Sequence, residues 1–189
     1  MSRYRPPGPP SSKYITAEGS ARLREELELL WKIKRPAVTK AVAEAAAQGD
    51  RSENAEYIYG KKQLGEIDRR IRHLRRRLEG IRVVDEPPGD PGRVYFGAWF
   101  ELDGEDGERR RYRLVGPDEV GFADDYVSID SPLGRAVRGK ALGDELSVAA
   151  PGGERLYRVA RIEYAAASER AVEKKPGSRP GSNSQGESR

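Results

Sequence analysis

Apolar residues recur at alternating steps of three and four along residues 64–81, a spacing typical of a helix packed along a partner helix. These residues are Leu64, Ile67, Ile71, Leu74, Leu78 and Ile81. An earlier seam is formed by Leu23, Leu27, Leu30, Val38, Val42 and Ala45. Because a short polar stretch with glycine joins the two seams, we predict an antiparallel helical hairpin. Each helix has about thirty residues and therefore spans about 45 Å.

Start and stop signals place the ends of the two helices. Thr16 is a suitable N-cap for the first helix, and Glu18 lies in its first turn, where the helix dipole favours an acid. Pro36 has no amide hydrogen, so we expect a kink just before it. Gly49 suits the position after the last residue of the first helix, and the second helix is expected to fade near Val84.

The pattern changes after residues 87–92, which are rich in Pro and Gly and indicate a linker. Residues with β-branched and aromatic side chains then predict strands at 94–102, 112–114, 126–129, 145–149 and 156–164. Ser131 followed by Pro132 indicates the start of a short helix that continues through Arg138.

We therefore predict an α+β protein with two domains. The coiled-coil hairpin is assigned to residues 14–85 and a small α+β domain to 86–165. The flanking stretches 1–13 and 166–189 contain mostly Pro, Gly, Ser and charged residues, so both are expected to be disordered.

Composition narrows the classes of protein. The chain of 189 residues is 35% charged and 36% hydrophobic, which suits a solvated helical arm and one modest core. No apolar run approaches the length of about 18 residues that a membrane span needs, and the N-terminus lacks the apolar segment of a secretory signal. The absence of cysteine excludes disulfides and thiolate metal sites, so a cytoplasmic location is expected.

The net charge of +4 is unevenly distributed. Residues 17–47 carry six Lys/Arg against five Asp/Glu, whereas residues 61–82 carry nine against three. The second helix therefore holds a basic stripe, formed by Arg69, Arg70, Arg72, Arg75, Arg76 and Arg77. Such a stripe would attract a phosphate backbone without sequence specificity, although it could also be an ordinary solvated face. A second basic cluster lies at residues 109–111.

Two acids, Asp50 and Glu53, lie between the helices at the hairpin tip. One interpretation is that Asp50 caps the second helix while Glu53 reaches back to it, as in a capping box. The other is that both carboxylates bind a divalent cation. Mg²⁺ prefers about six oxygen ligands, so two carboxylates would hold it only if a partner supplied the remainder. Both interpretations are compatible with the spacing.

Several chemistries have no support in the sequence. His73 is the only histidine, and a lone histidine forms neither a catalytic triad nor a zinc site. The Gly-rich pairs lie in turns and not between a strand and a helix, so no phosphate-binding loop is indicated. Because no complete metal site is visible, an autonomous nuclease is not expected.

The segment GDRSENAEYIYGKKQLGEIDRRIRHL at residues 49–74 closely resembles the bacterial transcript cleavage factors of the GreA/GreB family, and the GreB branch in particular. Further matching stretches follow the same order along residues 14–165: RPAVTK, FGAWFEL, RLVGPDE and YVSIDSPLGRA. The resemblance implies an N-terminal antiparallel coiled coil followed by a domain similar to the FKBP fold. It also implies an accessory factor for RNA polymerase that is not itself an enzyme.

The resemblance further implies roles for the candidate residues. The coiled coil would enter the secondary channel of RNA polymerase, where Asp50 and Glu53 would help to bind Mg²⁺ shared with the polymerase active site. The basic stripe would hold the 3′ end of backtracked RNA, and Asp130, Ser131 and Pro132 would contact the rim of the channel. We expect a monomer that binds no metal when free and that stimulates the polymerase's intrinsic endonucleolytic cleavage. The capping role of the tip acids then becomes secondary.

Two other functions are less consistent with the sequence. A regulator that occupies the channel without promoting cleavage is less consistent with the sequence, because both tip acids are present. A coiled coil that binds free RNA or DNA by itself is the least favoured, because Tyr57 and Tyr59 are the only aromatic residues near the tip on which bases could stack.

Overall fold

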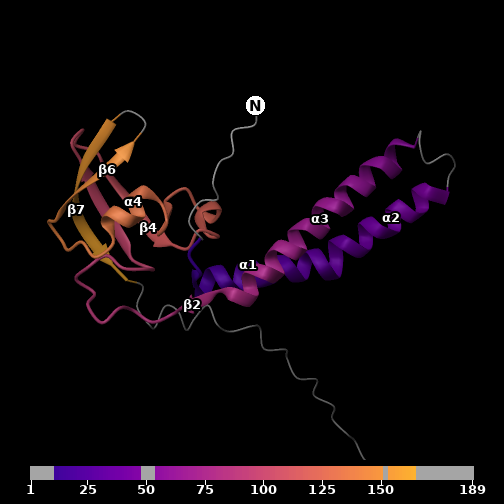
Figure 1. Ribbon diagram of the computed structural model, residues 1–189, viewed down its shortest axis with the longest axis horizontal. Helices are drawn as coiled ribbons and strands as arrows, with labels where there is room; N and C mark the ends of the chain where they lie inside the picture. Colours follow the sequence, from indigo (N-terminus) through magenta and orange to yellow (C-terminus); the bar gives the residue numbers. More distant parts are fainter. Residues whose placement is uncertain (1–10, 48–53, 151–152, 165–189) are drawn as a thin grey trace, which may run out of the picture.

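The structure is a computed structural model that describes residues 11–47, 54–150 and 153–164 (Figure 1). A long helical arm projects from a small sheet domain, and its two helices run side by side away from that domain (Figure 1). The predicted α+β class, with a helical hairpin followed by a small mixed domain, is confirmed.

The first side of the arm is one continuous helical run with three parts, α1 (Ala17–Leu29), a π-helical turn (Leu30–Lys34) and α2 (Arg35–Ala47). The second side is α3 (Ala55–Gly80), which contacts all three parts. The predicted seam forms the core of the arm, whose buried members are Ile15, Leu23, Leu30, Ile67, Ile71 and Leu74.

The π-helical turn explains an irregularity in the first seam. From Leu30 to Val38 the seam advances by eight residues, one more than a heptad. The amide of Arg35 donates to the carbonyl of Leu30, five residues back, so the turn takes up the extra residue. Pro36 follows and cannot donate a helical hydrogen bond of its own. A π-helical turn therefore lies directly before Pro36, where a kink was predicted, and it keeps the apolar residues facing α3.

Thr16 caps the first helix as predicted, since its Oγ1 accepts a hydrogen bond of 3.0 Å from the amide of Gly19. The prediction that Asp50 caps the second helix is wrong, because α3 begins at Ala55 and its N-cap is Asn54. The expected helix end at Gly49 lies outside the described residues.

The second helix ends earlier than expected. Residues 82–84 form β2 (Arg82–Val84), which pairs in parallel with β1 (Tyr14–Thr16). Ile81 already has extended backbone angles, and the β-branched pair that follows favours a strand. This two-stranded sheet ties the start of the first helix to the end of the second at the base of the arm.

The sheet domain contains five strands in the order β5-β4-β3-β7-β6. The strands are β3 (Trp99–Gly104), β4 (Arg109–Val115), β5 (Tyr126–Ser128), β6 (Glu145–Ala150) and β7 (Gly153–Glu163). Within this sheet, β4 and β5 pair in parallel, and the other neighbouring strands pair in antiparallel fashion. A 3-10 turn (Val120–Phe122) precedes β5 and α4 (Pro132–Val137) follows it. Phe100, Leu102, Leu114 and Val159 lie in the core.

The first strand of this domain is shorter than predicted. Gly97 has a φ of +85°, a left-handed conformation that ends extended pairing, so β3 starts only at Trp99. Val94 is fully buried but outside any strand. The apolar pattern therefore identified a core segment correctly but not its backbone conformation.

Candidate functional site

The tip of the arm lies between the end of α2 and the start of α3, at the end distant from the sheet domain (Figure 1). The predicted tip acids, Asp50 and Glu53, belong to this connection and lie outside the described residues.

Asn54 joins the two helices at the last described position before α3. Its side-chain oxygen accepts a hydrogen bond of 3.1 Å from the amide of Tyr57, and its amide nitrogen donates to the carbonyl of Ala45 at 2.9 Å. The first contact caps α3, and the second satisfies a carbonyl in the last turn of α2. Asn54 thereby fixes the spacing of the two helix ends that carry the tip. Asn is among the residue types most favoured at an N-cap, so the identity of Asn54 is the signal in the sequence that marks this helix start.

The two helices approach each other closely near the tip. Gly60 of α3 is buried, and a Cβ atom at this position would lie 2.6 Å from Cγ2 of Val42 on α2. A larger residue would therefore push the helices apart. Together with Asn54, this contact makes the last two turns of the arm a defined support for the tip.

The six arginines of the basic stripe fall into different environments. Arg70 forms two hydrogen bonds of 2.7 Å with the carboxylate of Glu26 on α1, and this contact raises the pKa of Arg70 despite partial burial. Arg77 donates to Asp118 and to the carbonyl of Ser12, each at 2.7 Å. These two side chains connect parts of the protein, so their charges are already compensated.

The other four arginines remain available. Arg69, Arg72 and Arg76 are exposed, and their spacing of three and four places them on one face of α3, opposite the apolar seam. No carboxylate pairs with them among the described residues. Arg75 lies over the ring of Trp31, with its guanidinium carbon 4.4 Å from the ring centroid. The uncompensated positive charge of the arm is therefore concentrated on the outer face of α3.

The second basic cluster is mostly neutralised. Arg109 pairs with Asp103 at 2.7 Å, and the hydrogen bond lowers the pKa of that carboxyl group. Arg110 pairs with Glu108, and Arg111 lies 3.3 Å from Glu163. Because each guanidinium has a carboxylate beside it on the sheet, this cluster does not form a strong phosphate-binding surface.

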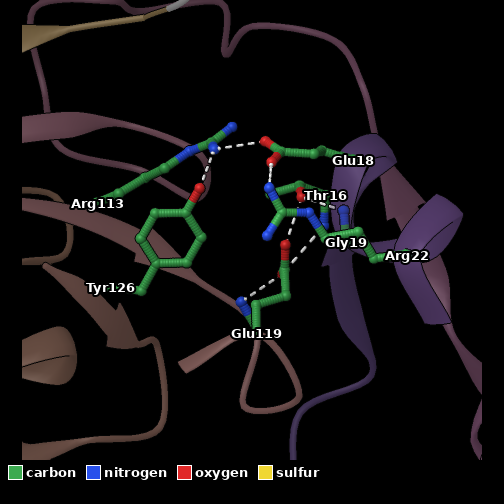
Figure 2. A network of polar contacts seen from close by, with 8 residues as sticks. Thr16, Glu18, Gly19, Arg22, Arg113, Glu119 and Tyr126 are labelled. Atoms are coloured by element: carbon green, nitrogen blue, oxygen red, sulfur yellow. Dashed lines mark hydrogen bonds and ion pairs between the residues drawn. The ribbon is translucent and has the colours of Figure 1, made fainter. Parts of the chain in front are cut away.

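A buried carboxylate joins the arm to the sheet domain (Figure 2). Glu119 is 1% exposed, and its Oε2 accepts hydrogen bonds from the amides of Thr16 at 3.1 Å and Gly116 at 2.9 Å. Its Oε1 accepts from the hydroxyl of Thr16. A Cβ atom on Gly19 would lie 2.2 Å from this Oε1, so the start of α1 fits closely against the carboxylate. Glu119 thus fastens the N-cap of the arm to the domain.

Arg113 of β4 forms the second half of the same junction (Figure 2). Its Nη1 donates to Glu18 at 2.9 Å and to the hydroxyl of Tyr126 at 2.7 Å, and its guanidinium also lies over Trp99. Burial lowers the pKa of Arg113, but the contacts with Glu18 and Tyr126 outweigh it and leave the pKa raised. Glu18, the acid that the helix dipole is expected to favour, therefore also connects α1 to the sheet.

The predicted polymerase-contact residues lie at the start of α4. Ser131 is the N-cap, since its Oγ accepts a hydrogen bond of 2.9 Å from the amide of Gly134, and Pro132 is at the first helical position. Asp130 accepts a hydrogen bond of 2.7 Å from the amide of Ser12. Residues 11–13 belong to the stretch predicted to be disordered, but the structure describes them, and Ser12 is held by Asp130 and Arg77. Residues 1–10 lie outside the described residues.

The rest of the described structure offers no alternative centre. Over residues 11–47, 54–150 and 153–164, no three His, Cys, Asp or Glu side chains are grouped as metal ligands. His73 is exposed on α3. Within the same ranges, no helix has the length and apolar character needed to cross a membrane.

Comparison with known proteins identifies both parts of the chain. Residues 13–83 match the family "Transcription elongation factor, N-terminal", and residues 89–164 match "Transcription elongation factor, GreA/GreB, C-term". The transcription elongation factor GreB of Pseudomonas aeruginosa is 62% identical over 87% of this chain and 98% of its own length. The GreB of Xanthomonas axonopodis pv. citri is 54% identical over 87% and 99%.

Among solved structures, the crystal structure of GreA factor homolog 1 from Thermus thermophilus is similar with 28% identity and a TM-score of 0.38, covering 80% of this chain and 99% of that one. The family assignment rests on the two family matches and on the relatives of high identity, which extend over both the arm and the sheet domain. The chain belongs to the GreA/GreB family of transcription elongation factors.

Proposed function

We propose that this chain binds RNA polymerase and stimulates the polymerase's own cleavage of backtracked RNA, which rescues arrested complexes. The observation that carries this proposal is the match of both domains, in order, to the transcription elongation factor family, together with 62% identity to a GreB protein. The chain acts as an accessory factor and supplies no complete active site of its own. It works as a monomer.

The tip acids act inside the polymerase. Asp50 and Glu53 are donors of the oxygen type that Mg²⁺ prefers, but two carboxylates leave most of its about six positions unfilled. The polymerase active site provides the other ligands. Asp50 and Glu53 would help to hold one Mg²⁺ there, in a two-metal hydrolysis in which one ion would activate water and the other would stabilise the leaving oxygen of the RNA. The contribution of this chain is to hold two carboxylates at the end of an arm whose helices are joined by Asn54.

The outer face of α3 holds the extruded RNA. Of the six stripe residues, Arg69, Arg72 and Arg76 carry charge without a carboxylate partner in the described part of the chain. Arg75 contributes from its position on Trp31. Arg70 and Arg77 act indirectly, because their contacts with Glu26, Asp118 and Ser12 shape the base of the arm.

The sheet domain docks at the rim of the secondary channel through Asp130, Ser131 and Pro132. The side chain of Ser131 is occupied as a helix cap, so it shapes this surface rather than reaching a partner. Pro132 is exposed at the first position of α4 and is free to make an apolar contact. The second oxygen of Asp130 is available to a donor on the polymerase, since the first already accepts from Ser12.

The experiment uses stalled, backtracked elongation complexes with 5′-labelled RNA and Mg²⁺. We expect the unmodified protein to shorten the RNA and restore elongation, and the double variant Asp50→Ala/Glu53→Ala to bind the complex without shortening it. Glu56→Ala is the matched control, since this exposed carboxylate of the first turn of α3 is not one of the two tip acids.

Three other results would contradict the proposal. Binding by the unmodified protein without shortening would indicate a channel regulator that does not promote cleavage. Equal shortening by the double variant would require another catalytic site. Loss of shortening in Glu56→Ala as well would show that the acids act through the general charge of the tip.

A further inference from the structure

An exposed tryptophan lies on the arm at the π-helical turn. Trp31 is 45% exposed although it is the largest side chain of the turn. Its neighbour Leu30 is 8% exposed and belongs to the seam, so the turn directs one apolar residue inward and leaves the indole outside. A π-helical turn is often found at functional sites, and the indole placed there has no role in the core of the arm.

Two guanidinium groups hold this indole. Arg75 of α3 lies 4.4 Å from the ring centroid, and Arg35 of α2 lies 5.5 Å from it. Arg35 is itself fixed by an ion pair of 2.8 Å with Asp68. Arg75 has no carboxylate partner among the described residues, so its charge is oriented by the ring but not neutralised. The exposed indole of Trp31 and the guanidinium of Arg75 together form an aromatic and cationic platform that bridges the two helices.

The platform is adjacent to the open basic face. Arg72 is one helical turn from Arg75, and Arg76 is the next residue, and both are exposed. Aromatic rings and guanidinium planes are the groups on which unpaired bases stack, and arginines beside them neutralise the phosphates. The platform therefore combines both halves of a binding site for a single-stranded nucleic acid.

We propose that Trp31 and Arg75 form a stacking site for a base of the extruded single-stranded RNA. This proposal rests on the proposed function. The position of the site defines which RNA can use it. Arg75 lies twenty residues from the start of α3, which corresponds to about 30 Å along the arm. A stacked strand at about 3.4 Å per nucleotide needs about nine nucleotides to cover this distance. Only RNA extruded over a long distance reaches the platform.

The experiment compares cleavage in complexes backtracked by about two and by about twelve nucleotides, lengths on either side of the about nine estimated from the stacking distance. We expect Trp31→Ala to raise the factor concentration for half-maximal cleavage of the long complex about tenfold, the effect of losing one base–aromatic stack. The requirement for the short complex changes by less than about twofold, because that RNA does not reach the platform. Trp31→Phe is expected to keep this concentration close to that of the unmodified protein, because an aromatic ring remains.

Ile33→Ala is the matched control. This side chain is 62% exposed on the same π-helical turn and has no arginine over it, so its removal leaves both complexes unaffected. If Trp31→Ala weakened both complexes equally, Trp31 would be a contact with the polymerase itself and the proposal would fail. If the phenylalanine variant behaved like the alanine variant, stacking would be excluded.

A direct measurement separates this proposal from the proposed function. The chain has two tryptophans, so Trp99→Phe leaves Trp31 as its only indole. Titration with a single-stranded oligoadenylate of about twelve nucleotides, longer than the stretch of about nine, is expected to quench the fluorescence of Trp31. The additional change Arg75→Gln weakens this quenching. Quenching without stimulated cleavage would overturn only the proposed function, whereas cleavage without quenching would overturn only the stacking site.

Discussion

Glu119 is the residue whose removal tests the junction between arm and domain most directly. In Glu119→Ala, the amides of Thr16 and Gly116 lose their acceptor inside the junction. Leaving a buried donor without a partner costs about 1–3 kcal/mol, so two amides give a loss of about 4 kcal/mol in the free energy of unfolding. The loss is large because the carboxylate is 1% exposed, and water cannot easily replace it.

The assay is urea unfolding followed by far-UV circular dichroism, with amide hydrogen exchange as the local measurement. We expect exchange to accelerate first at the start of α1 and in β1, which the carboxylate holds. Glu119→Gln keeps one acceptor oxygen and should lose about half as much stability. Glu105→Ala, an exposed acid in a turn, should change the free energy of unfolding by less than about 0.5 kcal/mol.

The reasoning is refuted if Glu119→Ala lowers the free energy of unfolding by less than about 1 kcal/mol. It is also refuted if the faster exchange appears in the sheet core and not at the junction. Either result would mean that the two amides find other partners or that the junction opens without cost.

Three further predictions concern two glycines in different environments and the cap residue of α3. Gly116→Ala should destabilise the junction by about 2 kcal/mol or more, because its Cβ would lie 2.2 Å from the carbonyl of Tyr14, a backbone atom that cannot move alone. Gly65→Ala is its opposite, since nothing lies within 4 Å and a helix gains about 1 kcal/mol from Ala; thermal unfolding of both variants should give shifts of opposite sign. Asn54→Ala should lower stability by about 1 kcal/mol through loss of the cap, with faster hydrogen exchange at Tyr57; unchanged exchange there would contradict the role of Asn54.

The local features of the fold were readable in the sequence. The heptad spacing predicted the helical hairpin, and the cap signals at Thr16 and at Ser131 are confirmed. Each of these depends on residues within a few positions of one another. Asn54 shows the limit of such signals, because the cap was predicted at Asp50, whereas Asn54 caps α3 and also contacts the last turn of α2.

The features that were missed depend on contacts between distant segments. The pairing of β1 with β2 joins residues 14–16 to residues 82–84, and no local pattern in either segment indicates its partner. Glu119 lies in a polar stretch and gave no sign of burial, because Thr16, which donates to it through both its amide and its hydroxyl, lies 103 residues earlier in the chain. The basic stripe was predicted as a unit, but whether an arginine is free depends on which carboxylates the fold places beside it.

The heptad repeat on either side of the π-helical turn determines by what steps the length of the arm can change. The turn takes up one residue, and on either side of it the apolar seam repeats in heptads that face α3. Removing one heptad from each helix would shorten the arm by about 10 Å and return the remaining seam residues to their partners. Removing any other number would rotate the tip around the arm. The length of the arm is therefore adjustable only in whole heptads, and under the proposed function this length would set how deep the tip reaches into the polymerase.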